Sequence, residues 1–265
     1  MTGSGGSGPG PVALVGSGEY LPALEFLERA LIAGRPPRYV QLATAAAPEG
    51  PTSLARWHGL GADAARRLDV EQVVVPVGDR DDADDSANAT LVAGAGLIYL
   101  SGGSPTYLTE TLRGTRVWAA IVDAWRNGAA LAGCSAGAMA LSAGFPGFRR
   151  PWRSSAGLGL VPVVRVIPHF DRFGGRLPDV ALRGLSRTQG TGGANAALLV
   201  GIDEETALVG GLADERDPGG WQADPAGPGN AWRVLGKRSA WLLGSEGRTR
   251  VTSGESVVLP APAAA

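Results

Sequence analysis

Short apolar runs alternate with stretches of helical spacing through the first half of the chain. The runs at 12–15, 39–43 and 73–77 are four or five residues long and rich in valine. Between them, segments 21–33 and 54–68 carry leucine and alanine at intervals of three and four residues, which predicts helices. Strands that alternate with helices predict a parallel sheet covered by helices on both faces.

The alternation continues towards residue 209, and the pattern then changes. Apolar runs at 96–100, 129–132, 161–167 and 196–200 predict further strands. The helices expected in this part of the chain cover residues 106–112, 117–127 and 176–187. Near the C-terminus, turns separate short β-rich stretches at 232–235, 240–243 and 256–259. We therefore predict a three-layer α/β/α fold with a mostly parallel sheet and a small antiparallel C-terminal appendage.

Three segments lack a regular period. Residues 144–157 and 214–230 are irregular and are expected to form surface loops. The acidic run at 79–85 fails the calcium-loop template, because its sixth and twelfth positions are Asp84 and Thr90 instead of glycine and glutamate. It is expected to be a solvated loop. Within it, Asp85 or Ser86 would cap a helix that starts near Ala87.

Length and composition narrow the class of protein. The chain has 265 residues, 44% of them hydrophobic, and no interior linker, so we expect one domain at 11–260 between flexible tails at 1–10 and 261–265. A net charge of -1 gives no electrostatic case for nucleic acid or for an anionic membrane. No apolar run approaches the ~18 residues of a membrane span, and the glycine-rich N-terminus lacks the regions of a signal peptide.

Cysteine and histidine are too scarce for the common metal sites. Cys134 is the single cysteine, which excludes an internal disulfide and a thiolate cluster and fits a reducing cytoplasmic location. The two histidines, His58 and His169, exclude a histidine-rich metal site. The first glycine turn, residues 16–20, does not match a dinucleotide site, because G-x-G-x-x-G would need glycine at Leu21. We expect neither a metal nor a cofactor.

A turn centred on Ser135 has the spacing of a nucleophile elbow. Gly133 and Gly137 flank this serine, and small residues there allow a sharp turn from strand to helix that exposes the serine Oγ. The motif alone is weak, since glycine turns are common in α/β proteins. Its context strengthens it, because a double-glycine turn at 102–103 follows the preceding strand. Backbone N–H groups at such a turn can face a substrate oxygen.

A serine nucleophile needs a base, and the base needs a carboxylate. His169 directly follows the strand 161–167 and is better placed than His58, which lies within a predicted helix. No acidic residue lies between Ser135 and His169, so the Ser, Asp, His order of α/β-hydrolases is excluded. The acid is expected after the histidine. The candidates are Asp171, Asp179, Asp203, Glu204 and Glu205.

Taken together, five motifs resemble the cyanophycinase and α-aspartyl dipeptidase family of serine peptidases. They are Ile98-Tyr-Leu-Ser-Gly-Gly103, Gly133-Cys-Ser-Ala-Gly-Ala138, Gly157-Leu-Gly-Leu-Val-Pro162, Pro168-His-Phe-Asp-Arg172 with Arg176, and Gly201-Ile-Asp-Glu-Glu-Thr-Ala-Leu208. They occur in the family order. The resemblance implies a class I glutamine amidotransferase-like (flavodoxin-like) fold with serine in place of the amidotransferase cysteine.

The resemblance also implies roles for individual residues. Ser135 matches the nucleophile, His169 the base and Glu204 the acid, while the N–H groups of Gly103 and Ala136 would form the oxyanion hole. Cys134 is expected to be inert.

The match is incomplete next to the histidine. Cyanophycinases have Asp-Gln ahead of it, where this chain has Ile167 and Pro168, and the dipeptidase acid between serine and histidine is missing. We therefore expect a divergent member of the family.

We expect a serine hydrolase that cleaves a small peptide or isopeptide through an acyl-enzyme on Ser135. Arg172 and Arg176 are candidates for binding a substrate carboxylate, or else form surface salt bridges. The alternatives are an esterase or amidase with a non-peptide substrate, and a catalytically silent binding module. Trp152 and Trp221, in the irregular loops, could serve a homodimer interface or a substrate lid.

Overall fold

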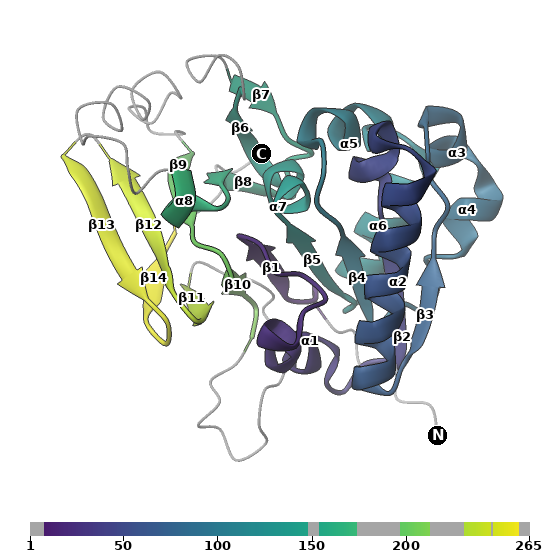
Figure 1. Cartoon of the computed structure of the whole chain (residues 1–265), viewed down its shortest axis with the longest axis horizontal. Coiled ribbons are helices and arrows are strands. Elements are labelled where there is room, and N and C mark those ends of the chain that lie inside the picture. Colours follow the sequence, from purple (N-terminus) through teal and green to yellow (C-terminus); the bar gives the residue numbers. More distant parts are fainter. Residues whose placement is uncertain (1–7, 148–153, 174–196, 213–230, 245, 260–265) are drawn as a thin grey trace.

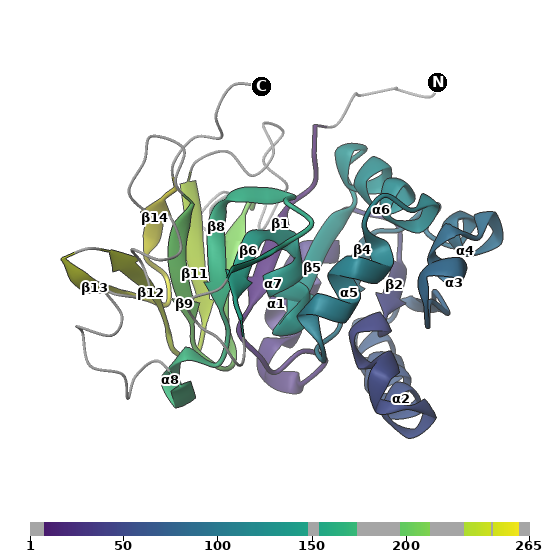
Figure 2. The same ribbon diagram turned by 90° about the horizontal axis from the view of Figure 1, so that it is seen from above.

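The computed structural model describes residues 8–147, 154–173, 197–212, 231–244 and 246–259. Within these residues the strands form two sheets (Figures 1 and 2). The larger sheet consists of Val12–Val15 (β1), Arg38–Leu42 (β2), Glu71–Val74 (β3), Leu97–Leu100 (β4), Ala130–Cys134 (β5), Thr206–Gly210 (β10), Ala231–Gly236 (β11) and Ser256–Val258 (β14). The second sheet consists of Ser142–Pro146 (β6), Ser154–Ala156 (β7), Val161–Ile167 (β8), Leu198–Ile202 (β9), Ser239–Gly244 (β12) and Gly247–Thr252 (β13).

The helices are mostly short. They are Glu25–Ile32 (α1), Pro51–Leu68 (α2), Arg80–Asp84 (α3), Ser86–Thr90 (α4), Pro105–Leu112 (α5), Arg116–Arg126 (α6), Ala136–Leu141 (α7) and Phe170–Phe173 (α8), with 3-10 turns at Pro22–Leu24 (η1) and Thr44–Glu49 (η2). None of the helices in the described residues has the length and apolar character needed to cross a membrane.

The larger sheet has a parallel half and an antiparallel half. Its strand order is β14-β11-β10-β1-β5-β4-β2-β3, in which β1, β5, β4, β2 and β3 are parallel. The strands β10, β11 and β14 continue the sheet in antiparallel pairing. The parallel half confirms the predicted architecture. It also brings the carboxyl ends of β1, β4 and β5 to one edge.

The second sheet has the order β13-β12-β9-β8-β6-β7 and is mixed. Its central strands β6, β8 and β9 are parallel, so the ends of β8 and β9 lie side by side. The C-terminal strands are antiparallel as predicted, but they are shared between the sheets: β11 and β14 extend the larger one, and β12 and β13 extend the second. Figures 1 and 2 show β12 and β13 at one end of the molecule and α3 and α4 at the other, where Figure 1 also shows β3.

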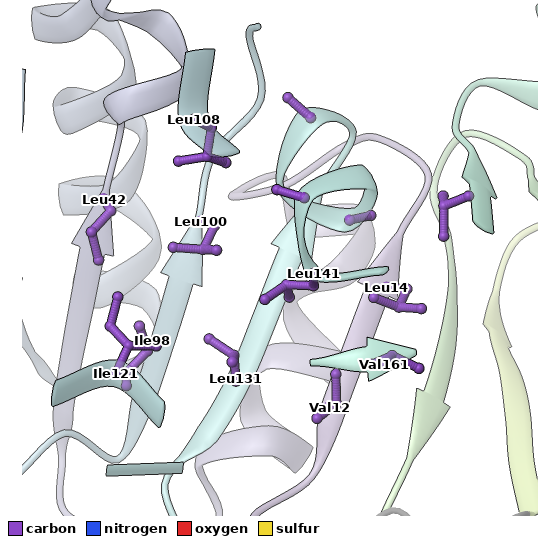
Figure 3. Packing of buried hydrophobic residues seen from close by; sticks show 14 of the residues in the cluster. Val12, Leu14, Leu42, Ile98, Leu100, Leu108, Ile121, Leu131, Leu141 and Val161 are labelled. Carbon is purple, nitrogen blue, oxygen red and sulfur yellow. The ribbon is translucent and has the colours of Figure 1, made fainter. Parts of the chain in front are cut away.

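The core has two parts because successive side chains of a strand point to opposite faces. Val12 and Leu14 of β1 pack in a cluster with residues of α5, α6, α7 and β8, whereas Ala13 and Val15 pack in a cluster with residues of α1 and α2. Figure 3 shows the first cluster, in which Leu141 of α7 lies close to the central strands. Helices thus cover both faces of the larger sheet. Strand β8 of the second sheet packs on the face that carries Val12 and Leu14.

Two sequence predictions were wrong in detail. The acidic run at 79–85 is not only a loop: Asp79 caps α3, and its carboxylate accepts the N–H groups of Asp81 and Asp82 at 2.9 and 3.0 Å. The segment 144–157 is not wholly irregular either, since β6 extends to Pro146 and residues 154–156 form β7.

Other expectations concern the tails and the capping of α4. The expected cap at Asp85 is confirmed by its 2.8 Å contact with the N–H of Ala87. Gly10, placed at the end of the N-terminal tail, is instead buried and donates its N–H to the Trp125 carbonyl at 2.8 Å. The predicted helix at 176–187, the loop at 214–230, the tail at 261–265, and Trp152, Asp179, Arg176 and Trp221 lie outside the described residues.

Candidate active site

Ser135 occupies the sharp turn between β5 and α7. Its φ is 49° and its ψ is -107°, a left-handed conformation that non-glycine residues rarely adopt. The flanking glycines are required by close contacts: a Cβ on Gly133 would lie 2.5 Å from the backbone of Gly137, and one on Gly137 would lie 2.3 Å from the Leu100 carbonyl oxygen. The backbone N–H of Ser135 donates to the Val15 carbonyl at 2.9 Å, which fixes the turn against β1.

His169 follows β8 and lies beside Ser135. Its Nε2 is 3.0 Å from the Ser135 Oγ, and its Nδ1 is 3.0 Å from the Oε1 of Glu204. The strand register explains this meeting, because Ile167 of β8 pairs with Gly201 of β9 and both chains continue past the same edge. His169 also has a positive φ of 49°, so the backbone turns there and directs the ring towards the serine. The hydrogen-bonded series of Ser135, His169 and Glu204 has the geometry of a nucleophile, a base and an orienting carboxylate.

Glu204 is held at both its side chain and its backbone. Its Oε2 is 2.9 Å from the Nε of Arg172, and its backbone N–H donates to the Oδ1 of Asp171 at 3.0 Å. The other carboxylate oxygen of Asp171 accepts from the Arg238 guanidinium at 2.6 Å. The carboxylates of Glu204 and Asp171 and the guanidinium groups of Arg172 and Arg238 therefore form one network on the Nδ1 side of the His169 ring.

The other candidate acids within the described residues have different partners. Asp203 accepts from the backbone N–H of Ser239 at 3.2 Å and from the indole N–H of Trp241 at 2.9 Å. Burial raises the pKa of Asp203, against the effect of these two hydrogen bonds. Glu205 forms an ion pair with Lys237 at 2.7 Å. Of the candidates in this part of the chain, Glu204 is the one whose carboxylate contacts the imidazole.

The double-glycine turn after β4 lies next to the serine. Strands β4 and β5 are parallel, and Leu100 of β4 pairs with Gly133 of β5. Gly103 lies three residues after Leu100, and Ala136 lies three residues after Gly133, so the two residues follow neighbouring strand ends. Gly103 has a φ of 135°, and a Cβ there would lie 2.3 Å from the Ala45 carbonyl oxygen, so no larger residue fits. The neighbouring Gly102 approaches Ser135, whose Cβ would lie 3.6 Å from a Cβ built on this glycine.

Of the two arginines expected to bind a substrate carboxylate, the structure describes Arg172 alone. Arg172 is 69% exposed and forms a salt bridge with Glu204, so at least its Nε contacts the acid. Arg176 lies outside the described residues. Phe173, 61% exposed, presents its ring edge-on to His169 at a centroid distance of 6.3 Å.

Sequence reasoning missed Glu19 and Trp57 as neighbours of the site. Glu19 is buried, and its carboxylate contacts Gly102 and Cys134. The Cη2 of Trp57 would lie 3.6 Å from a Cβ on Gly102. Trp57 belongs to α2, far from Gly102 in sequence, and no local pattern indicates that they meet.

Cys134 and His58 lie in surroundings that do not suit a nucleophile and its base: Cys134 is buried against Glu19, and His58 lies on α2. The Cys134 thiol is fully buried and donates to the Oε2 of Glu19 at 2.6 Å, and burial raises the pKa of this thiol. A thiolate nucleophile is disfavoured in such a place. Partial burial lowers the pKa of His58, on α2.

A serine on a strand-to-helix elbow, with a histidine and a glutamate beside it at the ends of two parallel strands, is the arrangement of a serine hydrolase. The mixed α/β fold is of the class I glutamine amidotransferase-like type. The family model of Peptidase family S51 matches residues 67–211. The chain therefore belongs to peptidase family S51 and is a serine peptidase.

Solved structures agree with this assignment. A peptidase from an acI-B1 Actinobacterium is 38% identical, with a TM-score of 0.79, and the match covers 96% of this chain and 98% of that one. A peptidase E homologue from Listeria monocytogenes EGD-e, 16% identical, matches 76% of this chain and 94% of its own length with a TM-score of 0.51, which shows the shared fold. No match was found among curated proteins.

Proposed function

We propose that Ser135, His169 and Glu204 form the catalytic triad of a peptidase that cleaves small peptides or isopeptides. The observation that carries this proposal is the pair of 3.0 Å contacts that joins Ser135 to His169 and His169 to Glu204. Membership of peptidase family S51 supports the hydrolysis of an amide bond.

In the first half of the proposed reaction, the Ser135 Oγ attacks the scissile carbonyl carbon and transfers its proton to the Nε2 of His169. Glu204 accepts the Nδ1–H, which fixes the tautomer and stabilises the imidazolium. The backbone N–H groups of Gly103 and Ala136 would hold the oxyanion of the tetrahedral intermediate. The C–N bond then breaks as the Nε2–H protonates the leaving amine, and an acyl-enzyme remains on Ser135.

In the second half, a water molecule gives a proton to His169 and attacks the acyl carbon. The second tetrahedral intermediate collapses, His169 returns the proton to the Ser135 Oγ, and the carboxylic acid product leaves. No lysine is needed for this sequence of proton transfers.

We propose that the acyl side of the substrate is an aspartyl residue. Arg172 supports this assignment, because its side chain is 69% exposed beside Glu204 and a guanidinium matches a carboxylate with paired hydrogen bonds. Its Nε can stay on Glu204 while the outer nitrogens face the substrate. The exposed ring of Phe173, next to His169, adds an apolar surface on the same side.

The test uses intact mass after treatment with a small fluorophosphonate. We expect wild type and His58→Ala to gain one adduct, and Ser135→Ala and His169→Ala to gain none. The two histidine variants are a matched pair, because these are the chain's two histidines. Labelling of Ser135→Ala at the wild-type rate would disprove the proposed nucleophile.

A substrate panel then separates the classes of bond. Wild type is expected to hydrolyse aspartyl dipeptides faster than alanyl dipeptides and faster than simple esters, with no turnover by Ser135→Ala. Turnover of esters alone would indicate an esterase. An unlabelled, inactive wild type would indicate a binding module.

A further inference from the structure

The turn between β1 and η1, residues 16–20, contacts the ends of several strands around Ser135. The Val15 carbonyl, just before the turn, accepts the N–H of Ser135 at 2.9 Å. Within the turn, the Ser17 carbonyl accepts the N–H of Glu205 at 3.1 Å. The end of β1 therefore contacts Ser135, and the turn that follows contacts the residue after Glu204. The proposed mechanism assigns this turn no role.

Glu19 in this turn joins two further segments through one carboxylate. Its side chain is buried, with 6% of the residue exposed. Its Oε1 accepts the backbone N–H of Gly102 at 3.0 Å, and its Oε2 accepts the Cys134 thiol at 2.6 Å. Gly102 immediately precedes Gly103, and Cys134 immediately precedes Ser135.

The carboxylate is in tight contact with the double-glycine turn. A Cβ on Gly102 would lie 2.9 Å from the Oε1 of Glu19, so the turn could not approach it with a larger residue. The next residue in the turn at 16–20 adds a second contact, because the Tyr20 hydroxyl is 2.6 Å from the Ser101 Oγ. From the other side, the Ala45 carbonyl accepts the N–H of Ser104 at 2.7 Å. The segment 101–104 is therefore held at three of its residues, Ser101, Gly102 and Ser104.

A buried carboxylate is costly unless each oxygen has a donor. Here both oxygens have one, and the two donors come from the two segments that carry the proposed oxyanion hole. Hydrogen bonds to a charged acceptor are shorter and stronger than neutral ones, so this contact resists displacement of either segment.

We propose that Glu19 is a positioning residue that sets the separation of the Gly103 and Ala136 N–H groups. The inference rests on the proposed function, because it assigns a role in stabilising the oxyanion. In this account Cys134 is a hydrogen-bond donor to Glu19 and has no chemical role of its own. Glu19 acts through the backbone and contacts neither substrate nor His169.

The expected kinetic signature follows from where the oxyanion forms. Its charge develops in the transition state, so a misplaced donor lowers kcat and leaves KM unchanged. Removing one such donor typically costs 100-fold or more, and we expect Glu19→Ala to lose about 100-fold. The pH midpoint of activity should stay at the wild-type value, because Glu19 does not touch His169.

The experiment measures the rate of fluorophosphonate labelling, since the P=O oxygen of the probe needs the same donors. The variants are Glu19→Ala, Glu19→Gln and, as a control outside the turn at 16–20, Glu110→Gln, which changes an exposed glutamate. Each is first melted, and rates are compared well below the melting temperature. We expect about 100-fold slower labelling of the Ala variant. The Gln variant should stay within fivefold of wild type, because its amide oxygen still accepts the Gly102 N–H.

Failures of the two proposals give different results. Wild type that is folded but unlabelled counts against the proposed function. Wild type that is labelled, with Glu19→Ala labelled equally fast, overturns the role of Glu19 alone. If Glu19→Ala does not fold, Glu19→Asp decides: its carboxylate is one methylene shorter and cannot reach both donors. Labelling of a folded Glu19→Asp at the wild-type rate would then overturn the inference.

Discussion

Two sets of residues hold the surroundings of Ser135 in place, and they differ in exposure. The exposed support, or exposed network, consists of Glu204, Asp171, Arg172 and Arg238, and the buried support, on the buried side of the site, is centred on Glu19 and Cys134. On the side of β8 and β9, His169 contacts an ionic network in which the side chains of Arg172 and Arg238 are 69% and 53% exposed. On the side of β1 and β4, Glu19 and Cys134 are buried and hydrogen-bonded to each other. Solvent screens the first support and not the second. In the proposed mechanism, His169, the group that changes charge, is therefore partly exposed, whereas Glu19 and Cys134, which hold the backbone beside Ser135, are buried.

The largest expected effect comes from Glu204, the proposed acid in the exposed network. Glu204→Gln keeps the shape of the side chain but removes the charge that stabilises the imidazolium, and we expect kcat to fall about 1000-fold. Glu205→Gln is the matched control, because Glu205 pairs with Lys237 instead of His169. Steady-state kinetics on an aspartyl dipeptide measure both variants. A loss below tenfold for Glu204→Gln would exclude it as the acid.

The second prediction concerns the buried side, where an unpaired charge should reduce stability. Burial raises the pKa of Glu28 from 4.5 to about 7, although the Tyr20 N–H and the Tyr39 hydroxyl, each 3.3 Å from its Oε1, oppose the rise. The nearby Arg67 also lowers this pKa, and Glu19 raises it. The Oε2 of Glu28 is buried and has no hydrogen-bond partner among the described residues.

The sign of the pH effect follows from proton binding. Between pH 4.5 and 7 the folded protein keeps a proton on Glu28 that the unfolded chain has released, so stability falls as the pH rises through this window. The full loss is about 3 kcal/mol at 1.36 kcal/mol per pKa unit. Glu28→Gln cannot ionise and should be about 3 kcal/mol more stable relative to wild type at pH 8 than at pH 4.

Urea unfolding at pH 4, 6 and 8 measures this difference, and Glu110→Gln, at an exposed glutamate, is the control. Parallel stability curves for wild type and Glu28→Gln would show that Glu28 titrates normally. Such a result would also weaken the contrast between the two supports, since the buried side would then tolerate charge without cost.

The two supports also differ in how far the sequence predicts them. Ser135, His169 and Glu204 each follow an apolar run: Ser135 follows β5 of the larger sheet, and His169 and Glu204 follow the paired parallel strands β8 and β9 of the second sheet. Which carboxylate meets the histidine was open from the residues alone, because Asp171 is two residues from His169 and Asp203, Glu204 and Glu205 are consecutive. The register of β8 with β9 and the family resemblance point to the same residue, Glu204.

The buried support was not predictable in the same way. Glu19 and Cys134 are 115 residues apart, and a glutamate in a glycine turn is usually solvated. The division of the C-terminal strands between two sheets was missed for a similar reason, because a β-rich stretch does not indicate its partner. A local signal was available for α3, where Asp79 and Asp82 form a capping box.

Arg172 gives the smallest expected effect and tests whether the exposed network also contacts substrate. A salt bridge this exposed contributes little, so Arg172→Gln should change kcat less than fivefold through Glu204. If the outer nitrogens bind the aspartyl carboxylate, KM for an aspartyl dipeptide should rise about tenfold, and KM for the matching asparaginyl dipeptide should not change. At 1 M salt, where the Debye length is about 3 Å, wild type should approach the variant. Equal KM changes for both dipeptides would leave Arg172 as a partner of Glu204 alone, and the substrate carboxylate would need another cation.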